Sequence, residues 1–294
     1  MIDVMSYSNF DRIGYYLFRK PIYDIGKIFS SPLMPTASKE FIDVIIPVIT
    51  KDLDILPYCI QGVRRNVLNR IKDIYLVGPP STQLIEFAKT NNLNFVDENS
   101  LFGFGPRDIN YVTDSGINRS GWLFQQLIKL SGKIGKCDNY ITIDSDHILI
   151  KPHVFLTEDN KFVFYRAPEF HFAYYMANKR LINCSKVPLL SYVAHKMIFN
   201  KVILADLKQN IENVSNTTWI DAIIASLDKH DLSSFSEFEL YASFVEKKRT
   251  ISKLWFQRAE VRKGAIDFFQ LCNSNRKFLS ITFPEYLHIN THKH

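Results

Sequence analysis

The chain has 294 residues, of which 46% are hydrophobic and 22% are charged, and this balance excludes a disordered or low-complexity protein. Its 36 Lys and Arg residues outnumber its 30 Asp and Glu residues. The net charge of +6 suits an anionic partner such as a nucleotide, a nucleic acid or an anionic membrane surface. The four cysteines follow no metal-ligand spacing and indicate a reducing, cytoplasmic compartment, and no apolar run approaches the ~18 residues of a membrane span.

Residues 1–40 form an aromatic and basic N-terminal segment that ends in a Ser- and Pro-containing connector over 30–38. Asp3 and Asp11 interrupt its start, so we predict no signal peptide. One interpretation is a peripheral contact with a membrane surface. The other, which we favour because no single apolar face is clear, is a helix or arm packed on its own domain or on a second subunit.

Residues 41–150 alternate between strand and helix patterns, which predicts an α/β half with a parallel sheet and right-handed crossovers. The near-continuous apolar run at 41–49 is typical of a buried parallel strand. Further strands are expected at 73–77, 93–96 and 139–143, and helices at 52–71, 81–89 and 120–133.

Residues 151–294 form the second half, which we expect to be mainly helical. The spacing of apolar residues predicts helices within 186–230 and over 236–248. Strand-like pieces occur at 162–165, 251–258 and 278–283, and the sequence contains no internal repeat.

The sharpest feature is a pair of carboxylates, Asp144 and Asp146, at the end of the strand expected at 139–143. In open α/β sheets, ligands bind beyond the carboxyl ends of the strands. Residues two apart leave a strand on the same side, so both carboxylates can face one ligand. Their hard oxygen atoms suit Mg²⁺ or Mn²⁺. The alternative is a plain turn, in which Asp is common.

This segment resembles the Asp-x-Asp motif of nucleotide-sugar-dependent glycosyltransferases with the GT-A fold, and the order of strands before it agrees. Together with the segments 119–130 and 235–241, it is similar to a bacterial group that acts in surface polysaccharide assembly. The resemblance covers roughly residues 41–290. It implies a GT-A-like nucleotide-binding sheet flanked by helices and a helical acceptor-side subdomain. It also implies transfer of a sugar, most often UDP-linked, to a glycan or lipid-linked acceptor.

The resemblance also implies roles for individual residues. Asp146 would bind Mn²⁺ or Mg²⁺ directly, and Asp144 would contact the metal or the donor ribose. The donor would be bordered by residues that follow the first two strands and by residues of the helix at 120–133: Pro47, Val48, Lys51, Asp52, Gly78, Pro79, Arg119, Gln125 and Gln126. Arg119 suits a phosphate, because a guanidinium donates two parallel hydrogen bonds. A solvated helix face is the alternative for both glutamines.

Two glutamates at the start of the helix expected over 236–248 are candidates for the catalytic base. Ser236 and Glu239 match a capping box, in which the Glu239 side chain reaches back to the Ser236 amide. Glu237 has no such role, and an inverting transferase needs a carboxylate to accept the proton of the acceptor hydroxyl. We therefore rank Glu237 above Glu239, although Glu237 also suits the positive end of a helix dipole.

Three histidines bear on the metal site. Many enzymes of the family use a late histidine as a metal ligand, and His195 and His288 are candidates. We expect His195 on an amphipathic helix, near the acceptor or the donor phosphates. His147 directly follows Asp146, and in a strand it would point to the opposite side.

Two other functions compete with glycosyl transfer. A nucleotidyltransferase would use the same carboxylates, but the segment 47–52 lacks the glycines of a phosphate-binding loop. A nucleic-acid-binding protein would suit the charge of +6, but no dense Lys and Arg stripe is present, so we expect no nucleic-acid partner.

Overall fold

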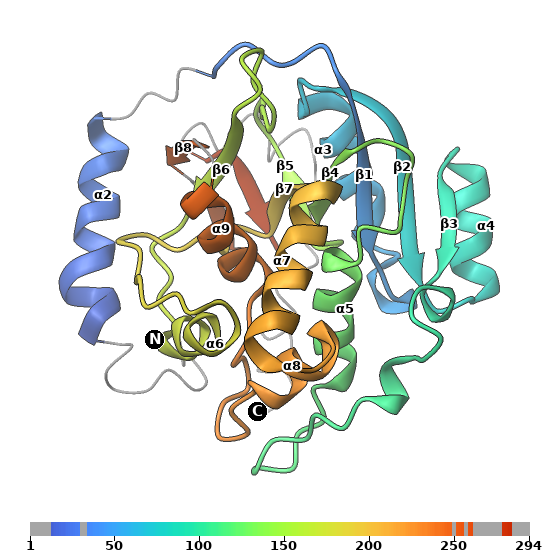
Figure 1. Ribbon diagram of the computed structural model, residues 1–294. Coiled ribbons are helices and arrows are strands. Elements are labelled where there is room, and N and C mark those ends of the chain that lie inside the picture. The colour runs from blue at the N-terminus through green and yellow to red at the C-terminus, as the bar shows by residue number, and fades with distance from the viewer. Residues whose placement is uncertain (1–12, 30–33, 249–250, 256–257, 261–277, 284–294) are drawn as a thin grey trace, which may run out of the picture.

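A five-stranded sheet forms the centre of the protein. The computed structural model describes residues 13–29, 34–248, 251–255, 258–260 and 278–283. Strand order is β3-β2-β1-β4-β7, with all pairs parallel except β4 and β7. The strands are β1 (Phe41–Pro47), β2 (Arg70–Gly78), β3 (Asn94–Asp97), β4 (Asn139–Ile143) and β7 (Lys196–Asn200). The expected α/β fold is confirmed, and the expected parallel sheet is parallel in every pair except β4 with β7 (Figure 1).

Helices cover both faces of the sheet, which explains why β1 is apolar almost throughout and buried after its first residue. The connecting helices of the first half are α3 (Leu56–Asn66), α4 (Thr82–Thr90) and α5 (Ser120–Leu130). Right-handed crossovers toward opposite edges of the sheet place α3 and α4 on one face and α5 on the other. The Ser81 hydroxyl accepts a hydrogen bond from the amide of Leu84 at 3.3 Å and caps α4, as predicted.

The strand order changes direction at β1. The chain first proceeds from β1 outward through β2 to β3, and then returns to add β4 on the other side of β1. At such a switch point the loops beyond the two strands diverge and leave a crevice at their carboxyl ends, where ligands of open α/β sheets bind. Asp144 and Asp146 follow β4 at this edge.

The second half adds a helical layer and two small sheets. Its helices are α6 (Phe172–Ile182), α7 (Lys201–Ser215), α8 (Trp219–Ala225) and α9 (Glu237–Lys248), and α9 contacts α5, α6 and α7. One sheet has β5 (His147–Leu149), β10 (Ser280–Thr282) and β9 (Arg258–Glu260), and the other pairs β6 (Phe162–Arg166) with β8 (Ile251–Trp255). Single turns of 3-10 helix occur at Thr50–Asp52, Glu98–Ser100 and Pro106–Asp108.

The prediction of helix through 186–230 is wrong for its first part. Residues 186–195 are irregular, and β7 follows, pairing with β4 and thereby joining the two halves in one sheet. His195 has φ of 58°, in the left-handed region, so no helix continues through it. The helix α6 was not predicted, and the helix expected at 52–71 spans only Leu56–Asn66, because β2 begins at Arg70.

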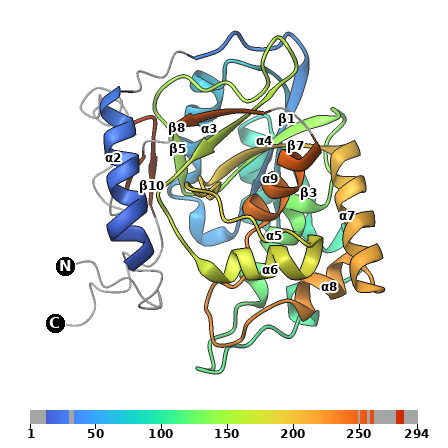
Figure 2. The ribbon, with the colours of Figure 1, turned by 60° about the vertical axis from the view of Figure 1, so that its left-hand side comes forward.

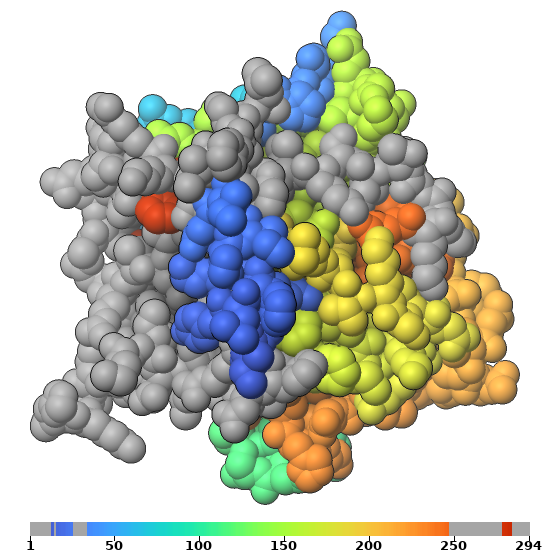
Figure 3. All heavy atoms as spheres, turned by 90° about the vertical axis from the view of Figure 1, so that its left-hand side faces the viewer, coloured from blue at the N-terminus to red at the C-terminus, as the bar shows by residue number. Residues whose placement is uncertain are grey.

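The described part of the N-terminal segment packs on its own chain. A π-helical turn (Tyr15–Arg19) leads into α2 (Lys20–Phe29), which lies along one side of the molecule (Figures 2 and 3). The Arg19 guanidinium donates hydrogen bonds to the carbonyl oxygens of Glu169 at 3.1 Å and Pro188 at 2.7 Å, and it lies over the Phe170 ring. Within the described ranges, every helix is too short or too polar to cross a bilayer.

Candidate active site

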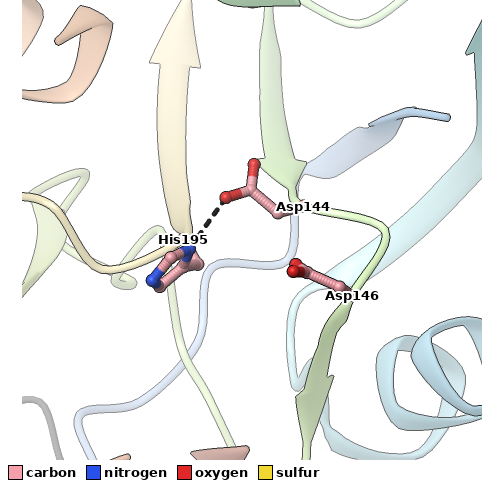
Figure 4. A group of neighbouring side chains, drawn as sticks. All are labelled: Asp144, Asp146 and His195. Carbon is pink, nitrogen blue, oxygen red and sulfur yellow. Dashed lines mark hydrogen bonds and ion pairs between the residues drawn. The ribbon is translucent and has the colours of Figure 1, made fainter. Parts of the chain in front are cut away.

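The two motif carboxylates lie in a tight turn between β4 and β5. The strand ends at Ile143, and the amide of His147 donates to the carbonyl oxygen of Asp144 at 3.0 Å, which closes the turn. Asp144 and Asp146 are both partly exposed, while Ser145 between them is buried. Both carboxylates are thereby held at the carboxyl end of β4 (Figure 4).

The antiparallel pairing of β4 and β7 brings a histidine to the same place. Ile143 pairs with Lys196, so Asp144, one residue beyond β4, lies opposite His195, one residue before β7. The Asp144 amide donates to the His195 carbonyl oxygen at 3.0 Å, and His195 Nδ1 donates to Asp144 Oδ2 at 2.9 Å. The expectation that His195 lies on an amphipathic helix is therefore wrong. Its roles near the donor phosphates or the acceptor, and as a metal ligand, stay predictions.

Asp144, Asp146 and His195 form a cluster that suits a divalent metal ion. One ligand atom from each residue lies within 4.8 Å of the others (Figure 4). Two carboxylates and one imidazole are ligands that Mn²⁺ accepts, and Mg²⁺ takes the same carboxylates. The donor set therefore fits the ion expected from the sequence. The other predicted histidine ligand, His288, lies outside the described residues.

A buried lysine adjoins the cluster and was missed in the sequence. Lys129 Nζ lies 2.6 Å from Asp144 Oδ1 and 2.8 Å from Glu237 Oε1. Lys129 belongs to α5 and Glu237 to the first turn of α9, and the contact between these helices brings the two residues together. The available signal was a lysine between Ile128 and Leu130 on a largely apolar helix.

The charges in this group shift one another's protonation. Burial acts to raise the pKa of Asp144, but Lys129 and His195 outweigh it and hold that pKa well below the usual range. Burial and the neighbouring Asp144 raise the pKa of Asp146 to about 6. Burial opposes a charge on His195, but its hydrogen bond to Asp144 raises its pKa. Asp144 is thus the firmly ionised member of the pair.

Asp52 connects the end of β1 to the motif turn. Its Oδ2 accepts a hydrogen bond from the Ser145 hydroxyl at 2.9 Å. The other predicted residues near β1 differ in exposure. Pro47, which ends β1, and Val48, which follows it, are buried, whereas Lys51 is exposed. Of this group, the structure brings Asp52 into contact with the segment that carries Asp144 and Asp146.

Gly78, at the end of β2, lies against the backbone of the loop after β1. A Cβ at this position would lie 2.1 Å from the carbonyl oxygen of Val48, so the close approach of the two segments requires glycine. Pro79, the next residue, is partly exposed. The contact of either residue with a nucleotide stays a prediction.

The predicted phosphate contact, Arg119, has partners within the chain. Its Nε donates to the carbonyl oxygen of Leu232 at 2.8 Å, and its guanidinium lies over the ring of Trp122. It therefore connects the start of α5 to the loop that precedes α9. A role on the donor phosphates stays a prediction.

The two predicted glutamines of α5 differ. Gln126 is buried and donates to the carbonyl oxygen of Trp122 at 3.1 Å, while Lys129 Nζ lies 3.4 Å from its Oε1. A solvated face is therefore wrong for Gln126. Gln125 is only partly buried and remains the better candidate for a ligand contact.

Glu239 makes only half of the predicted capping box. Its amide donates to the Ser236 hydroxyl at 3.3 Å. Its carboxylate instead accepts hydrogen bonds from the Ser191 hydroxyl at 2.5 Å and the Tyr192 amide at 2.8 Å. The Glu239 side chain therefore holds the segment that leads to His195.

His147 contacts residues outside the carboxylate pair, as expected. Its Nδ1 shares a hydrogen bond with the Thr282 hydroxyl at 2.7 Å, and its Nε2 lies 3.1 Å from Lys196 Nζ. One face of the ring stacks on His195 with 5.4 Å between the ring centroids. His147 therefore connects the sheet of β5, β9 and β10 to the ring of His195.

Fold and site together define an α/β protein with a candidate divalent-metal site at the switch point of its sheet. The chain belongs to the family described as "Family of unknown function (DUF6492)", whose model matches residues 42–274. No curated protein matches the chain by sequence.

Solved structures with a similar course of the chain include mouse xyloside xylosyltransferase 1 in its apo form and the galactosyltransferase LgtC in complex with donor and acceptor sugar analogs. The first has a TM-score of 0.46 and 8% identity, over 84% of this chain and 99% of that one. The second has a TM-score of 0.44 and 10% identity, over 82% of this chain and 87% of that one. Similarities this distant do not assign a reaction to this chain. The function must be argued from the site residues.

Proposed function

We propose that this protein is a metal-dependent glycosyltransferase that moves a sugar from a UDP-linked donor to a glycan or lipid-linked acceptor in surface polysaccharide assembly. The observation that carries this proposal is the cluster of Asp144, Asp146 and His195, whose ligand atoms lie within 4.8 Å of one another. A bound Mn²⁺ or Mg²⁺ would neutralise the negative charge of the diphosphate leaving group.

The residues around the cluster would bind and orient the donor. Asp144, Asp146 and His195 would hold the ion that the diphosphate shares. Asp52 and Lys51, beyond β1, and Gly78 and Pro79, beyond β2, would border the nucleotide, because both loops lie at the edge where ligands of such sheets bind. Arg119 and Gln125, at the start and middle of α5, are the proposed polar contacts to phosphate and sugar.

The acceptor hydroxyl must lose a proton as it attacks the anomeric carbon, and a positioned carboxylate contributes about 10²–10⁴ in rate. Glu237 stays the predicted base among the carboxylates of α9. Its side chain is almost fully buried and paired with Lys129, so this role requires that the substrate reach it within the site. Replacing Glu237 by Gln would then lower kcat at saturating metal by that order.

The experiment that tests the proposed function is a thermal-shift screen of nucleotide sugars with and without Mn²⁺. A ligand that binds only the folded state raises the melting temperature by mass action. We expect a UDP-sugar to stabilise the protein in the presence of Mn²⁺ and much less in its absence. Transfer to a soluble acceptor, followed by mass spectrometry of the product, then identifies the reaction.

Two other outcomes would contradict the proposal. Equal stabilisation by nucleotide sugars with and without divalent ions would show that donor binding does not require the metal. Binding to DNA or RNA with a steep salt dependence, and none to nucleotide sugars, would favour the nucleic-acid alternative.

The outer face of the N-terminal helical segment supports a peripheral membrane contact, which would place the protein at the inner face of the membrane beside a lipid-linked acceptor. Its large apolar side chains Ile13, Tyr16, Leu17, Phe18 and Ile25 are each more than half exposed, while Arg19 and Tyr23 pack inward. Aromatic and aliphatic groups of this kind enter the lipid interface. Sedimentation with anionic liposomes should therefore fall for Leu17→Ser and Phe18→Ser, while transfer to a soluble acceptor persists.

A further inference from the structure

A row of three charged groups leads from the interior of the protein to the candidate metal site. Glu237 Oε1 lies 2.8 Å from Lys129 Nζ, which lies 2.6 Å from Asp144 Oδ1. The side chains of Glu237 and Lys129 are 3% and 5% exposed, whereas that of Asp144 is 25% exposed. Three separate elements, α9, α5 and the turn after β4, supply the three groups.

Both oxygens of Asp144 are engaged by the protein itself. Lys129 contacts Oδ1, and His195 Nδ1 donates to Oδ2 at 2.9 Å. A lysine ammonium and a divalent cation are attracted by the same carboxylate, so Lys129 both orients Asp144 and competes for its charge. In this buried place the competition is poorly screened by solvent.

Glu237 and Asp144 share the Lys129 ammonium. The ammonium lies at nearly equal distances from the two carboxylates, and the burial of Lys129 and Glu237 makes the charges depend on one another. Without the Glu237 charge, Asp144 would be the one remaining carboxylate of this row that pairs with Lys129. Lys129 would then hold Asp144 more tightly against any incoming ion.

We infer that Glu237 is a positioning residue that acts through Lys129 to set the affinity of the Asp144, Asp146 and His195 site for a divalent cation. The inference rests on the metal site of the proposed function. It adds to the base role of the proposed function, because here Glu237 would act without touching the substrate and before any donor binds.

Titration of the full-length protein with Mn²⁺ alone, followed by calorimetry and by thermal shift, tests this role. Glu237→Gln should weaken Mn²⁺ binding about tenfold, the ratio that corresponds to 1.4 kcal/mol. The matched control is Glu246→Gln on the same helix, whose carboxylate pairs with Lys186 at 2.7 Å. This control should bind Mn²⁺ as the wild-type protein does.

Two further variants separate action through Lys129 from a direct effect of the Glu237 charge on the ion. Glu237→Asp keeps the charge but withdraws it from Lys129, so it should weaken Mn²⁺ binding about as much as Glu237→Gln. In a Lys129→Met background, Glu237→Gln should lose most of its effect on Mn²⁺ affinity, as a double-mutant cycle would show. If Lys129→Met does not fold, the comparison of Glu237→Asp with Glu237→Gln still decides.

Three results would overturn the inference. Wild-type affinity in Glu237→Gln, with a lowered kcat at saturating Mn²⁺, would leave Glu237 with the base role alone and the proposed function intact. Wild-type affinity in Glu237→Asp would mean that the charge acts on the ion without Lys129. A wild-type protein that binds no divalent ion would overturn both the inference and the metal site of the proposed function.

Discussion

At the scale of single residues, Asp146 carries a negative charge that its surroundings disfavour. Burial and then the nearby Asp144 raise its pKa from 3.8 to about 6. Because the folded state holds this proton up to a higher pH than the unfolded state, the contribution of Asp146 to stability is present at low pH. It is lost as the pH rises from about 4 to about 6.

Replacement of Asp146 by Asn should therefore separate stability from metal binding. Without metal at neutral pH, Asp146→Asn should be more stable than the wild-type protein by on the order of 1 kcal/mol, because a partly exposed charge next to Asp144 is removed. The same variant should lose the stabilisation by Mn²⁺ and the transfer activity, because a ligand carboxylate is gone.

Thermal unfolding with and without Mn²⁺ measures both effects. The control is Glu86→Gln, which removes an exposed carboxylate of α4 and should keep the Mn²⁺ response. Near-normal turnover of Asp146→Asn with added Mn²⁺ would contradict the central assignment.

Metal binding should also depend on pH. Asp146 must be deprotonated to act as a ligand, and protonation of His195, whose pKa is raised by Asp144, also opposes a metal ion. The affinity for Mn²⁺ should therefore fall as the pH is lowered through about 6. Calorimetry at about pH 5 and about pH 7.5 checks this direction, and equal affinity at both would exclude Asp146 as a ligand.

At the scale of elements, the close contact between the end of β2 and the loop after β1 sets the edge of the sheet near the site. Gly78 permits this contact, since a Cβ would lie 2.1 Å from a backbone oxygen of Val48. Gly78→Ala should therefore destabilise the protein by about 1–3 kcal/mol, the range for overpacking in a rigid place. Denaturant unfolding measures this loss.

Gly121 in the first turn of α5 provides the matched control. A Cβ there would meet nothing within 4 Å, and alanine favours a helix over glycine. Gly121→Ala should leave stability unchanged or raise it by up to about 1 kcal/mol. Equal stability of the two variants would mean that the segments at Gly78 and Val48 can separate without a cost in free energy.

At the scale of the whole molecule, Arg19 fastens the N-terminal segment to the second half. Its guanidinium is buried between two carbonyl oxygens, of Glu169 and Pro188, and the ring of Phe170. Arg19→Ala would leave those carbonyl oxygens without this donor, and we expect a loss of about 1–3 kcal/mol in the free energy of unfolding.

The neighbouring Lys20 serves as the control for this prediction. It pairs with Asp24 at 2.6 Å, but both side chains are over two-fifths exposed, so Lys20→Ala should cost at most about 0.5 kcal/mol. Denaturant unfolding of both variants gives the comparison. An Arg19→Ala protein as stable as Lys20→Ala would show that the segment contributes little to the fold.

The α/β class, the four parallel strands and the place of the paired carboxylates were predictable from the sequence alone. These features are local: a continuous apolar run marks a strand covered on both faces, and Asp144 and Asp146 directly follow such a run. The helix N-cap at Ser81 was also predictable, because its hydrogen bond spans three residues.

The rest of the site depends on contacts between residues that are far apart in the sequence. His195 comes to Asp144 through the antiparallel pairing of β4 with β7, over 51 residues of chain, and the helical spacing around His195 gave the wrong local structure. Lys129 and Glu237 meet because α5 packs against α9, across 108 residues. The periodicity of apolar residues indicates which face of a helix or strand is buried. The residues that contact that face depend on how distant elements pack, and no local sequence pattern encodes this packing.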